Sequence, residues 1–344
     1  VRYIPVHLSR AGLNPFKDQF YRRELERIFT SERPDVVLAY TIKPVIHGMR
    51  AAEQTGVPGR YALITGLGAA FHTSGLKGWV LRMAGLWFYR RSLRHCTRIM
   101  VQNGDIAEFF LREGIVKDRS RLMVVAGSGV DTLHFTPTRP PKDSLMFILL
   151  ARMLRDKGVE EYVSAARVVK RQLPQARFLL VGDTDPNPAA IFQEQLDVWN
   201  REGVVEYRPA VSDVRPLLAE CSVYVLPSYH EGMPRSVLEA MATGRPVITT
   251  DAIGCRETVI NVGPPDSEGI RLGDNGLLVP IRGVAPLAAA MLRLAGDAGL
   301  REKMGRRGRE IAEQRFDVRL INDVMLRAMD LIPARNSSLA TPRS

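Results

Sequence analysis

The sequence predicts an α/β protein with two domains, each a parallel sheet covered by helices. Short apolar strands alternate with helical patterns along most of the chain, which is typical of parallel sheets. A length of 344 residues suits two domains, and a proline-rich stretch at 136–143 separates two series of such units. We expect four parts: a first domain at 1–135, a second at 136–315, a helix at 316–332 and a disordered tail at 333–344.

The first domain is expected to open with a strand and to repeat helix and strand from there. The predicted strands are 1–6, 34–39, 60–65, 99–102 and 121–125, and the predicted helices are 18–31, 44–55, 79–95 and 105–113. The glycine-rich segment 65–78 follows a strand. Ligands bind at that edge of open α/β sheets, although a simple flexible connection is an equally good interpretation.

Bulky aromatic and basic side chains are combined at 77–95, which contains Arg90, Arg91 and Arg94. Such a composition suits a helix that lies on an anionic membrane. Aromatic residues at helical spacing are also common in protein cores. Both interpretations stay open from the sequence.

The second domain is expected to start at Leu145. Its predicted strands are 145–150, 177–181, 204–209, 223–226, 246–250 and 275–280, and its predicted helices are 159–172, 189–201, 213–221, 234–243, 284–295 and 298–314. Pro234 suits the first position of a helix and Gly244 its exit, and Phe316 is expected to open the last helix.

The loop and helix that follow strand 223–226 form the first candidate site. The backbone N–H groups of Gly232, Met233, Arg235 and Ser236 gather at the positive end of a helix, where a phosphate or a sugar hydroxyl binds well. Carboxylates stand on either side, at Glu231 before the helix and Glu239 within it. Simpler interpretations exist, because Glu231 could merely favour the helix dipole and Glu239 could pair with Arg235.

A second group follows strand 145–150. Arg152 and Lys157 lie at the carboxyl end of that strand, where two cations with several donors could bind a diphosphate and stabilise it as it leaves. Taken alone, they could also form a solvated basic turn.

Composition limits the partners. The chain is 45% hydrophobic and 25% charged with a net charge of +11, and residues 1–135 hold 20 lysines and arginines against 11 acidic residues. A basic half attracts anionic partners, but no nucleic-acid-binding motif is visible, so we expect no nucleic-acid partner. No apolar run approaches the roughly 18 residues that span a bilayer. Cys96, Cys221 and Cys255 are widely spaced, which suggests reduced, structural thiols.

Two patterns together resemble one enzyme family. Glu231-x7-Glu239 is followed by Ala-x-Ala-x-Gly-x-Pro-Val-Ile, and Arg152-x4-Lys157-Gly158 precedes it in the expected order. These patterns resemble the retaining group 1 (family 4) nucleotide-sugar glycosyltransferases. The resemblance implies two Rossmann-like domains facing across a cleft, the GT-B fold. It also implies catalysis without a divalent metal or other cofactor.

The resemblance also implies residue roles. Arg152 and Lys157 would bind the donor diphosphate, Glu239 the ribose hydroxyls, and Glu231 with the N–H groups of Gly232 and Met233 the donor sugar. Segment 31–135 is most similar to bacterial enzymes that extend lipid-linked or surface polysaccharides. This implies transfer of a hexose or N-acetylhexosamine from a UDP-sugar to a lipid-linked or polysaccharide acceptor, by a cytoplasmic enzyme at the inner face of the plasma membrane.

Two other functions are compatible with these patterns, namely a sugar-nucleotide epimerase of GT-B fold and an inactive nucleotide-sugar-binding remnant. In the resembling family the strand expected at 1–6 would be the second of its sheet, so a first strand, loop and helix would precede it. We therefore expect these residues to bind donor but to transfer sugar poorly. Many relatives carry a sugar-contacting histidine after the strand at 60–65. His72 comes seven residues later, and its role stays open.

Overall fold

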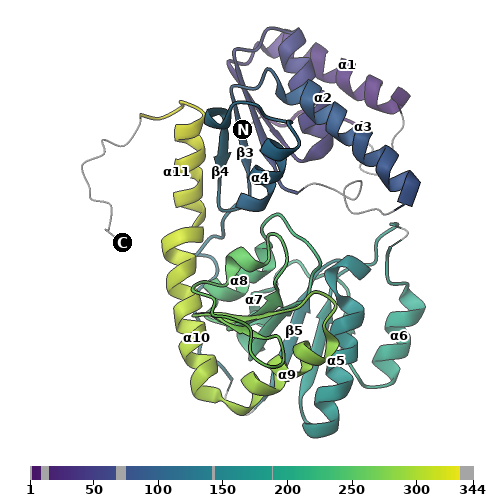
Figure 1. Ribbon diagram of the computed structural model, residues 1–344, viewed down its shortest axis with the longest axis vertical. Helices are drawn as coiled ribbons and strands as arrows, with labels where there is room; N and C mark the ends of the chain where they lie inside the picture. The colour runs from purple at the N-terminus through teal and green to yellow at the C-terminus, as the bar shows by residue number, and fades with distance from the viewer. Residues whose placement is uncertain (1, 9–14, 67–74, 142–143, 188, 334–344) are drawn as a thin grey trace. The chain divides into compact units, whose positions relative to one another are not determined.

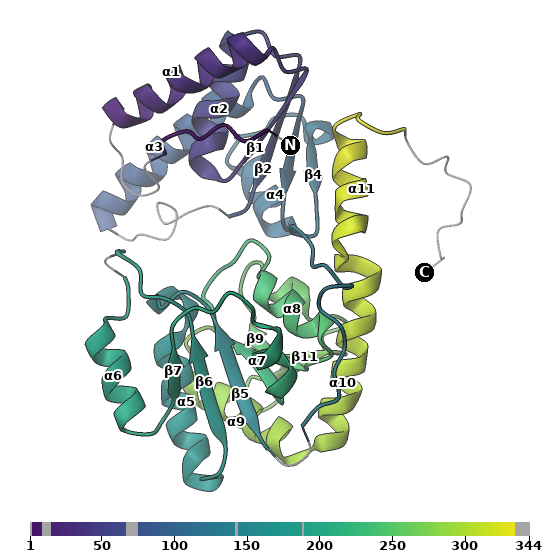
Figure 2. The same ribbon diagram turned by 180° about the vertical axis from the view of Figure 1, so that it is seen from behind.

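The computed structural model describes residues 2–8, 15–66, 75–141, 144–187 and 189–333 (Figures 1 and 2). The chain forms two compact units: unit 1 is Val1–Val125 with Ile321–Ser344, and unit 2 is Ala126–Leu320. His72, most of segment 65–78 and the expected tail beyond 333 lie outside the described residues.

Unit 1 holds a four-stranded parallel sheet in the order β1-β2-β3-β4. Its elements in chain order are α1 (Pro15–Glu32), β1 (Val36–Tyr40), α2 (Ile42–Gln54), β2 (Gly59–Ile64), α3 (Gly75–Leu93), β3 (Arg98–Val101), α4 (Gly104–Arg112) and β4 (Leu122–Val124). The chain returns to this unit near its end, in α11 (Val318–Ala328).

The strand predicted at 1–6 is wrong. Residues 2–8 have no regular structure, and Tyr3 is 85% exposed. Apolar alternation alone does not make a strand, because a strand needs a neighbouring backbone to complete its hydrogen bonds. No described strand pairs with this segment. Its Arg2 forms an ion pair of 3.0 Å with Glu32.

Side-chain alternation in β2 explains how the sheet of unit 1 is covered. Ala62 and Ile64 pack into a core that they share with α2, α3 and α4. Tyr61 points to the other face, where its hydroxyl donates a hydrogen bond of 3.0 Å to the carbonyl of Met329. The sheet is therefore buried on both faces at its centre, as expected for parallel strands.

Unit 2 contains a seven-stranded sheet in the order β10-β11-β9-β8-β5-β6-β7, parallel except for β10. Its strands are β5 (Met146–Leu150), β6 (Arg177–Val181), β7 (Glu206–Arg208), β8 (Val223–Leu226), β9 (Val247–Thr250), β10 (Arg271–Leu272) and β11 (Gly276–Val279). Its helices are α5 (Val159–Gln172), α6 (Gln193–Arg201), α7 (Arg215–Glu220), α8 (Arg235–Ala242), α9 (Val284–Gly296) and α10 (Ala298–Ile311).

This strand order decides where a ligand binds. The chain builds β5, β6 and β7 in one direction and then returns to add β8, β9 and β11 on the other side of β5. Such a doubly wound sheet has a switch point between its first and fourth strands, where the loops part and leave a crevice. Here the switch point lies between β5 and β8, the two strands that precede the two candidate groups.

Several predicted elements of unit 2 are confirmed to the residue, including α5, β6 and β8. Two predicted helix starts are wrong. Pro234 is the N-cap of α8, with extended backbone (φ −73°, ψ 106°), and does not occupy its first turn. Residues Ala312–Phe316 form a π-helical turn, so the last helix begins at Val318 and not at Phe316.

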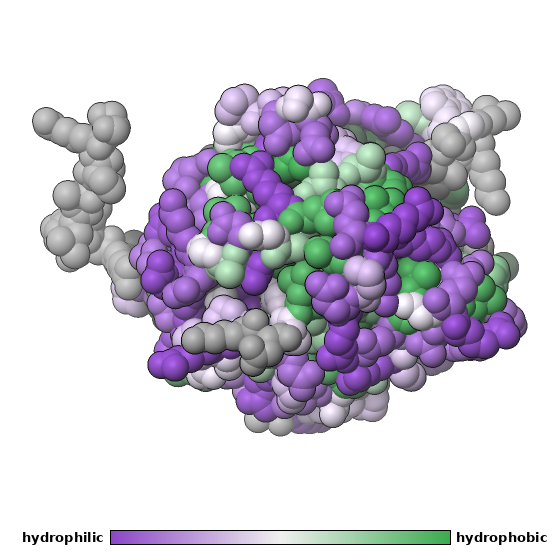
Figure 3. Space-filling view, turned by 90° about the horizontal axis from the view of Figure 1, so that it is seen from below, coloured by the Kyte–Doolittle hydropathy of each residue, from purple (hydrophilic) through white to green (hydrophobic). Residues whose placement is uncertain are grey.

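Two further features concern the surface and the cysteine thiols. Hydrophilic residues cover much of the face in Figure 3, and hydrophobic residues reach the surface between them. Of the helices that the structure describes, none combines the length and apolarity needed to cross a membrane. Cys96, Cys221 and Cys255 are buried and free, and burial raises the pKa of each thiol to about 12.

Candidate functional site

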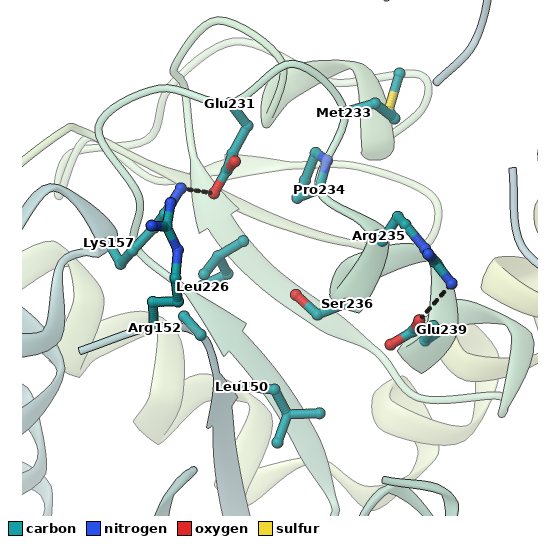
Figure 4. A pocket seen from close by; sticks show the side chains of 11 residues that line it. Leu150, Arg152, Lys157, Leu226, Glu231, Met233, Pro234, Arg235, Ser236 and Glu239 are labelled. Atoms are coloured by element: carbon teal, nitrogen blue, oxygen red, sulfur yellow. Dashed lines mark hydrogen bonds and ion pairs between the residues drawn. The ribbon is translucent and has the colours of Figure 1, made fainter. Parts of the chain in front are cut away.

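A cavity of about 440 Å³ lies at the switch point of unit 2 (Figure 4). It is lined by residues from the ends of β5 and β8, from the loops that follow these strands and from the first turns of α8: Leu150, Ala151, Arg152, Lys157, Leu226, Glu231, Met233, Pro234, Arg235, Ser236 and Glu239. All but one of the predicted site residues therefore meet here. The exception, Gly232, is buried and does not line the cavity.

The loop after β5 carries Lys157 toward the β8 side of the cavity. Lys157 ends a short 3₁₀ turn, Arg155–Lys157, and Gly158 then adopts a left-handed conformation with φ of 71°. A Cβ at position 158 would lie 2.1 Å from the carbonyl oxygen of Pro227. Only glycine permits this backbone approach. The contact brings the two loops together and places Lys157 beside the segment that follows β8.

The loop after β8 is fixed by backbone hydrogen bonds on both sides. The N–H of Tyr229 donates to the carbonyl of Asp156 (2.8 Å), and the N–H of Glu231 donates to the carbonyl of Ile253 (2.9 Å). Gly254, with φ of 80°, lies so close that a Cβ there would be 2.2 Å from the carbonyl oxygen of Glu231. The backbone position of Glu231 is therefore fixed independently of what its side chain contacts.

Lys157 and Glu231 form an ion pair across the cavity. Lys157 Nζ lies 2.7 Å from Glu231 Oε1, and their side chains are only 15% and 18% exposed (Figure 4). Charged groups removed from water to this extent interact more strongly than a surface pair does. The carboxylate keeps the ammonium group in place, and a bound anion would have to share that cation with Glu231.

Arg152 is arranged differently. Its side chain is 63% exposed, and its Nη1 donates to Asp185 Oδ2 at 2.7 Å. The sequence predicted the cation but not this partner, which lies in the loop after β6. A long exposed side chain can leave such a pair at little cost, because exposed ion pairs contribute only about 0–1 kcal/mol.

The start of α8 closes the cavity on its remaining side. The first N–H groups of a helix have no carbonyl partner within the helix, and those of Arg235 and Ser236 occupy this position. The hydroxyl of the buried Tyr224 lies 2.6 Å from Ser236 Oγ, which fixes that side chain. One turn further, Arg235 Nη2 lies 3.4 Å from Glu239 Oε1, as the simpler interpretation of Glu239 predicted. Burial is the main cause that raises the pKa of Glu239, and the nearby Arg235 opposes it.

A glycine explains the position of Met233. Gly127 has φ of 73°, and a Cβ there would lie 2.5 Å from Met233 Cγ. The turn at 126–130 thus packs against the rim of the cavity. Neighbouring backbone groups pair with the π-helical turn, since the N–H of Val130 donates to the carbonyl of Phe316 (2.8 Å).

A second cavity, which no sequence pattern predicted, adjoins the first. It measures about 410 Å³ and shares Leu150, Ala151 and Arg152 with it. Its other lining residues follow β6 and β7: Val181, Gly182, Asp183, Thr184, Ala210, Val211 and Val214. A signal in the sequence was Gly182, which directly follows β6, the strand that pairs with β5. With a Cβ at this position, Ala151 O would be only 1.8 Å away.

The chain also contains an Asp-x-Asp sequence, Asp183-Thr184-Asp185. The expectation of a metal-free site did not consider these residues. Carboxylates of this kind suit Mg²⁺ or Mn²⁺. Here Asp183 Oδ1 accepts from the N–H of Ala210 (2.9 Å), and Asp185 is engaged by Arg152. Within the described ranges, no three His, Cys, Asp or Glu side chains cluster in a way that could hold a metal ion.

The sequence patterns of two protein families match the chain. The family described as "Glycosyl transferases group 1" matches residues 144–297, and the "Glycosyl transferase 4-like domain" matches residues 1–127. A similar protein is the N,N'-diacetylbacillosaminyl-diphospho-undecaprenol alpha-1,3-N-acetylgalactosaminyltransferase of Campylobacter jejuni. It is 32% identical over 277 residues, which cover 76% of this chain and 70% of that protein.

Further similarities concern one more enzyme and two solved structures. The UDP-Gal:alpha-D-GlcNAc-diphosphoundecaprenol alpha-1,3-galactosyltransferase of Escherichia coli is 26% identical over 267 residues, 73% of this chain and 66% of that protein. The fold matches sucrose-phosphate synthase from Thermosynechococcus elongatus, with a TM-score of 0.75, 21% identity, and coverage of 93% and 80% of the two chains. It also matches Anabaena Alr3699/HepE in complex with UDP and glucose, with a TM-score of 0.72, 20% identity, and coverage of 91% and 81%.

Proposed function

The chain belongs to the group 1 glycosyltransferases, and we propose that it transfers a hexose or N-acetylhexosamine from a UDP-sugar with retention of anomeric configuration. The acceptor would be a lipid-linked saccharide or a polysaccharide. One observation carries the proposal: three cations, two carboxylates and a helix N-terminus line a single cavity at the switch point of unit 2. This combination suits a ligand with a diphosphate at its centre and hydroxyl-bearing groups at both ends.

Lys157, Arg152 and the start of α8 would bind the diphosphate. When the bond between the sugar and the diphosphate breaks, the bonding electrons stay with the diphosphate, so negative charge grows there. Fixed cations and a helix dipole at that place stabilise this charge without reorganising. Lys157 is already fixed by Glu231, whereas Arg152 would turn from Asp185 toward the phosphate.

The two carboxylates would bind the two ends of the donor. Glu239, on the α8 side, would accept hydrogen bonds from the ribose hydroxyls. Glu231, with the N–H groups of Gly232 and Met233, would bind the hydroxyls of the transferred sugar. Glu231 would share Lys157 with the diphosphate. Binding of the sugar would therefore be linked to stabilisation of the leaving group.

The adjoining cavity would receive the nucleobase. It lies against the ribose and phosphate positions through Arg152, and its lining from Val181, Val211 and Val214 offers apolar contacts for a flat ring. The relatives whose names include diphospho-undecaprenol or UDP support a UDP-sugar donor and a lipid-linked acceptor for this chain. Such an acceptor would place the enzyme at the inner face of a membrane.

The experiment is a transfer assay with a panel of UDP-, GDP- and dTDP-sugars and a short polyprenyl-diphosphate saccharide as acceptor. We expect UDP release that depends on acceptor, and a product whose new linkage is α when the donor is α, measured by the anomeric proton coupling in NMR. A β-linked product would contradict retention. A sugar epimer formed from the donor alone would instead identify an epimerase.

A further inference from the structure

Unit 1 contains a cavity that is not part of the donor site. It measures about 350 Å³ and lies where α1, α2 and α3 meet, three helices that pack beside one another in Figures 1 and 2. Each helix contributes one arginine to its lining: Arg22 from α1, Arg50 from α2 and Arg91 from α3. A cavity of this size is in the range of small-ligand sites.

The charges around this cavity do not cancel. Asp18 is paired with Lys43 at 2.9 Å, and Arg22 is paired with Glu26 at 3.1 Å. Neither Arg50 nor Arg91 has a carboxylate within 4.0 Å among the residues that the structure describes. Two guanidinium groups are thus left to bind an external anion.

The three arginines also affect one another. Burial lowers the pKa of the Arg50 guanidinium, and repulsion from Arg22 and Arg91 lowers it further. The carboxylates of Glu53 and Glu26 oppose this shift only in part. Repulsion among like charges held this close is unfavourable, and a multivalent anion would relieve it. Guanidinium groups bind phosphate through paired N–H donors, so a phosphate or diphosphate group fits this cavity best.

A row of exposed apolar side chains leads along α3 to the cavity. Trp79, Met83, Trp87 and Arg91 follow one another at four-residue spacing, which places them along one side of the helix. Trp79 is 61% exposed, Met83 42% and Trp87 54%. The Arg91 guanidinium lies 5.9 Å from the centre of the Trp87 ring, so the row ends at the cavity.

The other side of α3 is core. Leu86, Tyr89 and Leu93 are buried against α2 and α4, and the Tyr89 and Phe110 rings are 5.4 Å apart. The two interpretations of segment 77–95 therefore apply to different faces of one helix. Exposed tryptophans beside cations are typical of proteins that rest at a membrane surface.

We propose that this cavity binds the phosphate or diphosphate group of a lipid, with the lipid chain beside the exposed row of α3. The proposal deepens the proposed function, on which it rests in taking a lipid-linked acceptor as the ligand. The cationic cavity matches the head of such a molecule, and the apolar row matches the membrane in which its chain lies. Binding is measured without catalysis, so it can fail independently of the transfer reaction.

The test is co-sedimentation with phosphatidylcholine vesicles that contain a few per cent of a polyprenyl diphosphate, with and without inorganic pyrophosphate as competitor. We expect the wild-type chain to bind these vesicles and pyrophosphate to displace it. Replacing Arg22, Arg50 and Arg91 together by Gln should weaken binding about tenfold or more. UDP binding by unit 2, measured by calorimetry, should stay unchanged, and a circular dichroism spectrum and melting temperature equal to those of wild type would show that unit 1 is folded.

A matched control removes the same charge from nearby positions. Arg23, Arg27 and Arg94 are exposed on or beside the same helices and do not line the cavity. Their triple Gln variant should bind within about twofold of wild type if the cavity is specific.

Equal losses in both triple variants would overturn the site in favour of general charge attraction. Equal binding to phosphatidylglycerol vesicles of matched charge would overturn the lipid diphosphate as ligand. Failure to bind UDP, with lipid binding intact, would count against the proposed function alone.

Discussion

Replacing Lys157 by Ala tests how the donor site stabilises its leaving group. Lys157 Nζ lies 2.7 Å from Glu231, and both side chains are more than four-fifths buried, so this ammonium is fixed before the donor binds. Removing one such preorganised contact to a developing charge costs about 2.7–4 kcal/mol, or roughly 10²–10³ in kcat. We expect a loss of this size for Lys157→Ala.

Arg152→Ala provides the internal comparison. Its side chain is 63% exposed and must leave Asp185 to reach the phosphate. A charge-assisted hydrogen bond made at that cost contributes less, about 1.5 kcal/mol or roughly tenfold in kcat. Lys157 and Arg152 carry the same charge. The larger loss expected for Lys157→Ala therefore follows from the greater burial of its side chain.

The assay is acceptor-dependent UDP release at saturating donor, with calorimetric UDP binding and thermal unfolding of each variant. Lys157→Ala alone leaves the Glu231 carboxylate partly buried without its cation, which destabilises the fold. The double variant Lys157→Ala with Glu231→Gln should recover melting temperature but not turnover. Wild-type turnover by Lys157→Ala, or a larger loss for Arg152→Ala, would refute the reasoning.

Three further predictions concern other parts of the molecule. Incubation with EDTA should leave the transfer rate unchanged, because Lys157, Arg152 and the start of α8 neutralise the diphosphate; a rate restored only by Mg²⁺ or Mn²⁺ would contradict this. Gly254→Ala should destabilise by at least about 1–2 kcal/mol in urea unfolding, since φ is 80° and Glu231 O blocks the Cβ; wild-type stability would be inconsistent with the close approach. Hydrogen bonds from Arg319 lower the pKa of Asp317 below its ordinary 3.8, so its stabilisation is present above pH 3.8 and is lost as the pH falls further. Asp317→Asn should therefore melt below wild type at pH 7, and the gap should narrow below about pH 4; a gap independent of pH would exclude this carboxylate as its cause.

The sequence by itself determined most of the secondary structure of unit 2 and most of the residues that line its first cavity. Apolar runs bounded by turn residues located β6, β8 and α5 to the residue, because each is a local pattern with strong punctuation. The resemblance then brought Arg152, Lys157, Glu231 and Glu239 into one site, and the strand order explains why. All four follow the two strands that flank the switch point.

Contacts between distant residues were decided by the tertiary structure. The Lys157–Glu231 pair joins positions 74 residues apart, and it forms because Gly158 and Pro227 bring two backbones together. Likewise, the partner of Arg152 follows a different strand. No spacing in the sequence encodes such distances.

Unit 1 shows the same limit more clearly. The apolar alternation at 1–6 predicted a strand, but a strand also requires a neighbour, and sequence alone does not supply one. In α3 the composition was ambiguous because the helix is apolar on both sides. Only packing decided that Tyr89 belongs to the core while Trp79 and Trp87 remain exposed. The physical reason is that burial depends on which other surfaces a side chain meets, and those surfaces come from elsewhere in the chain.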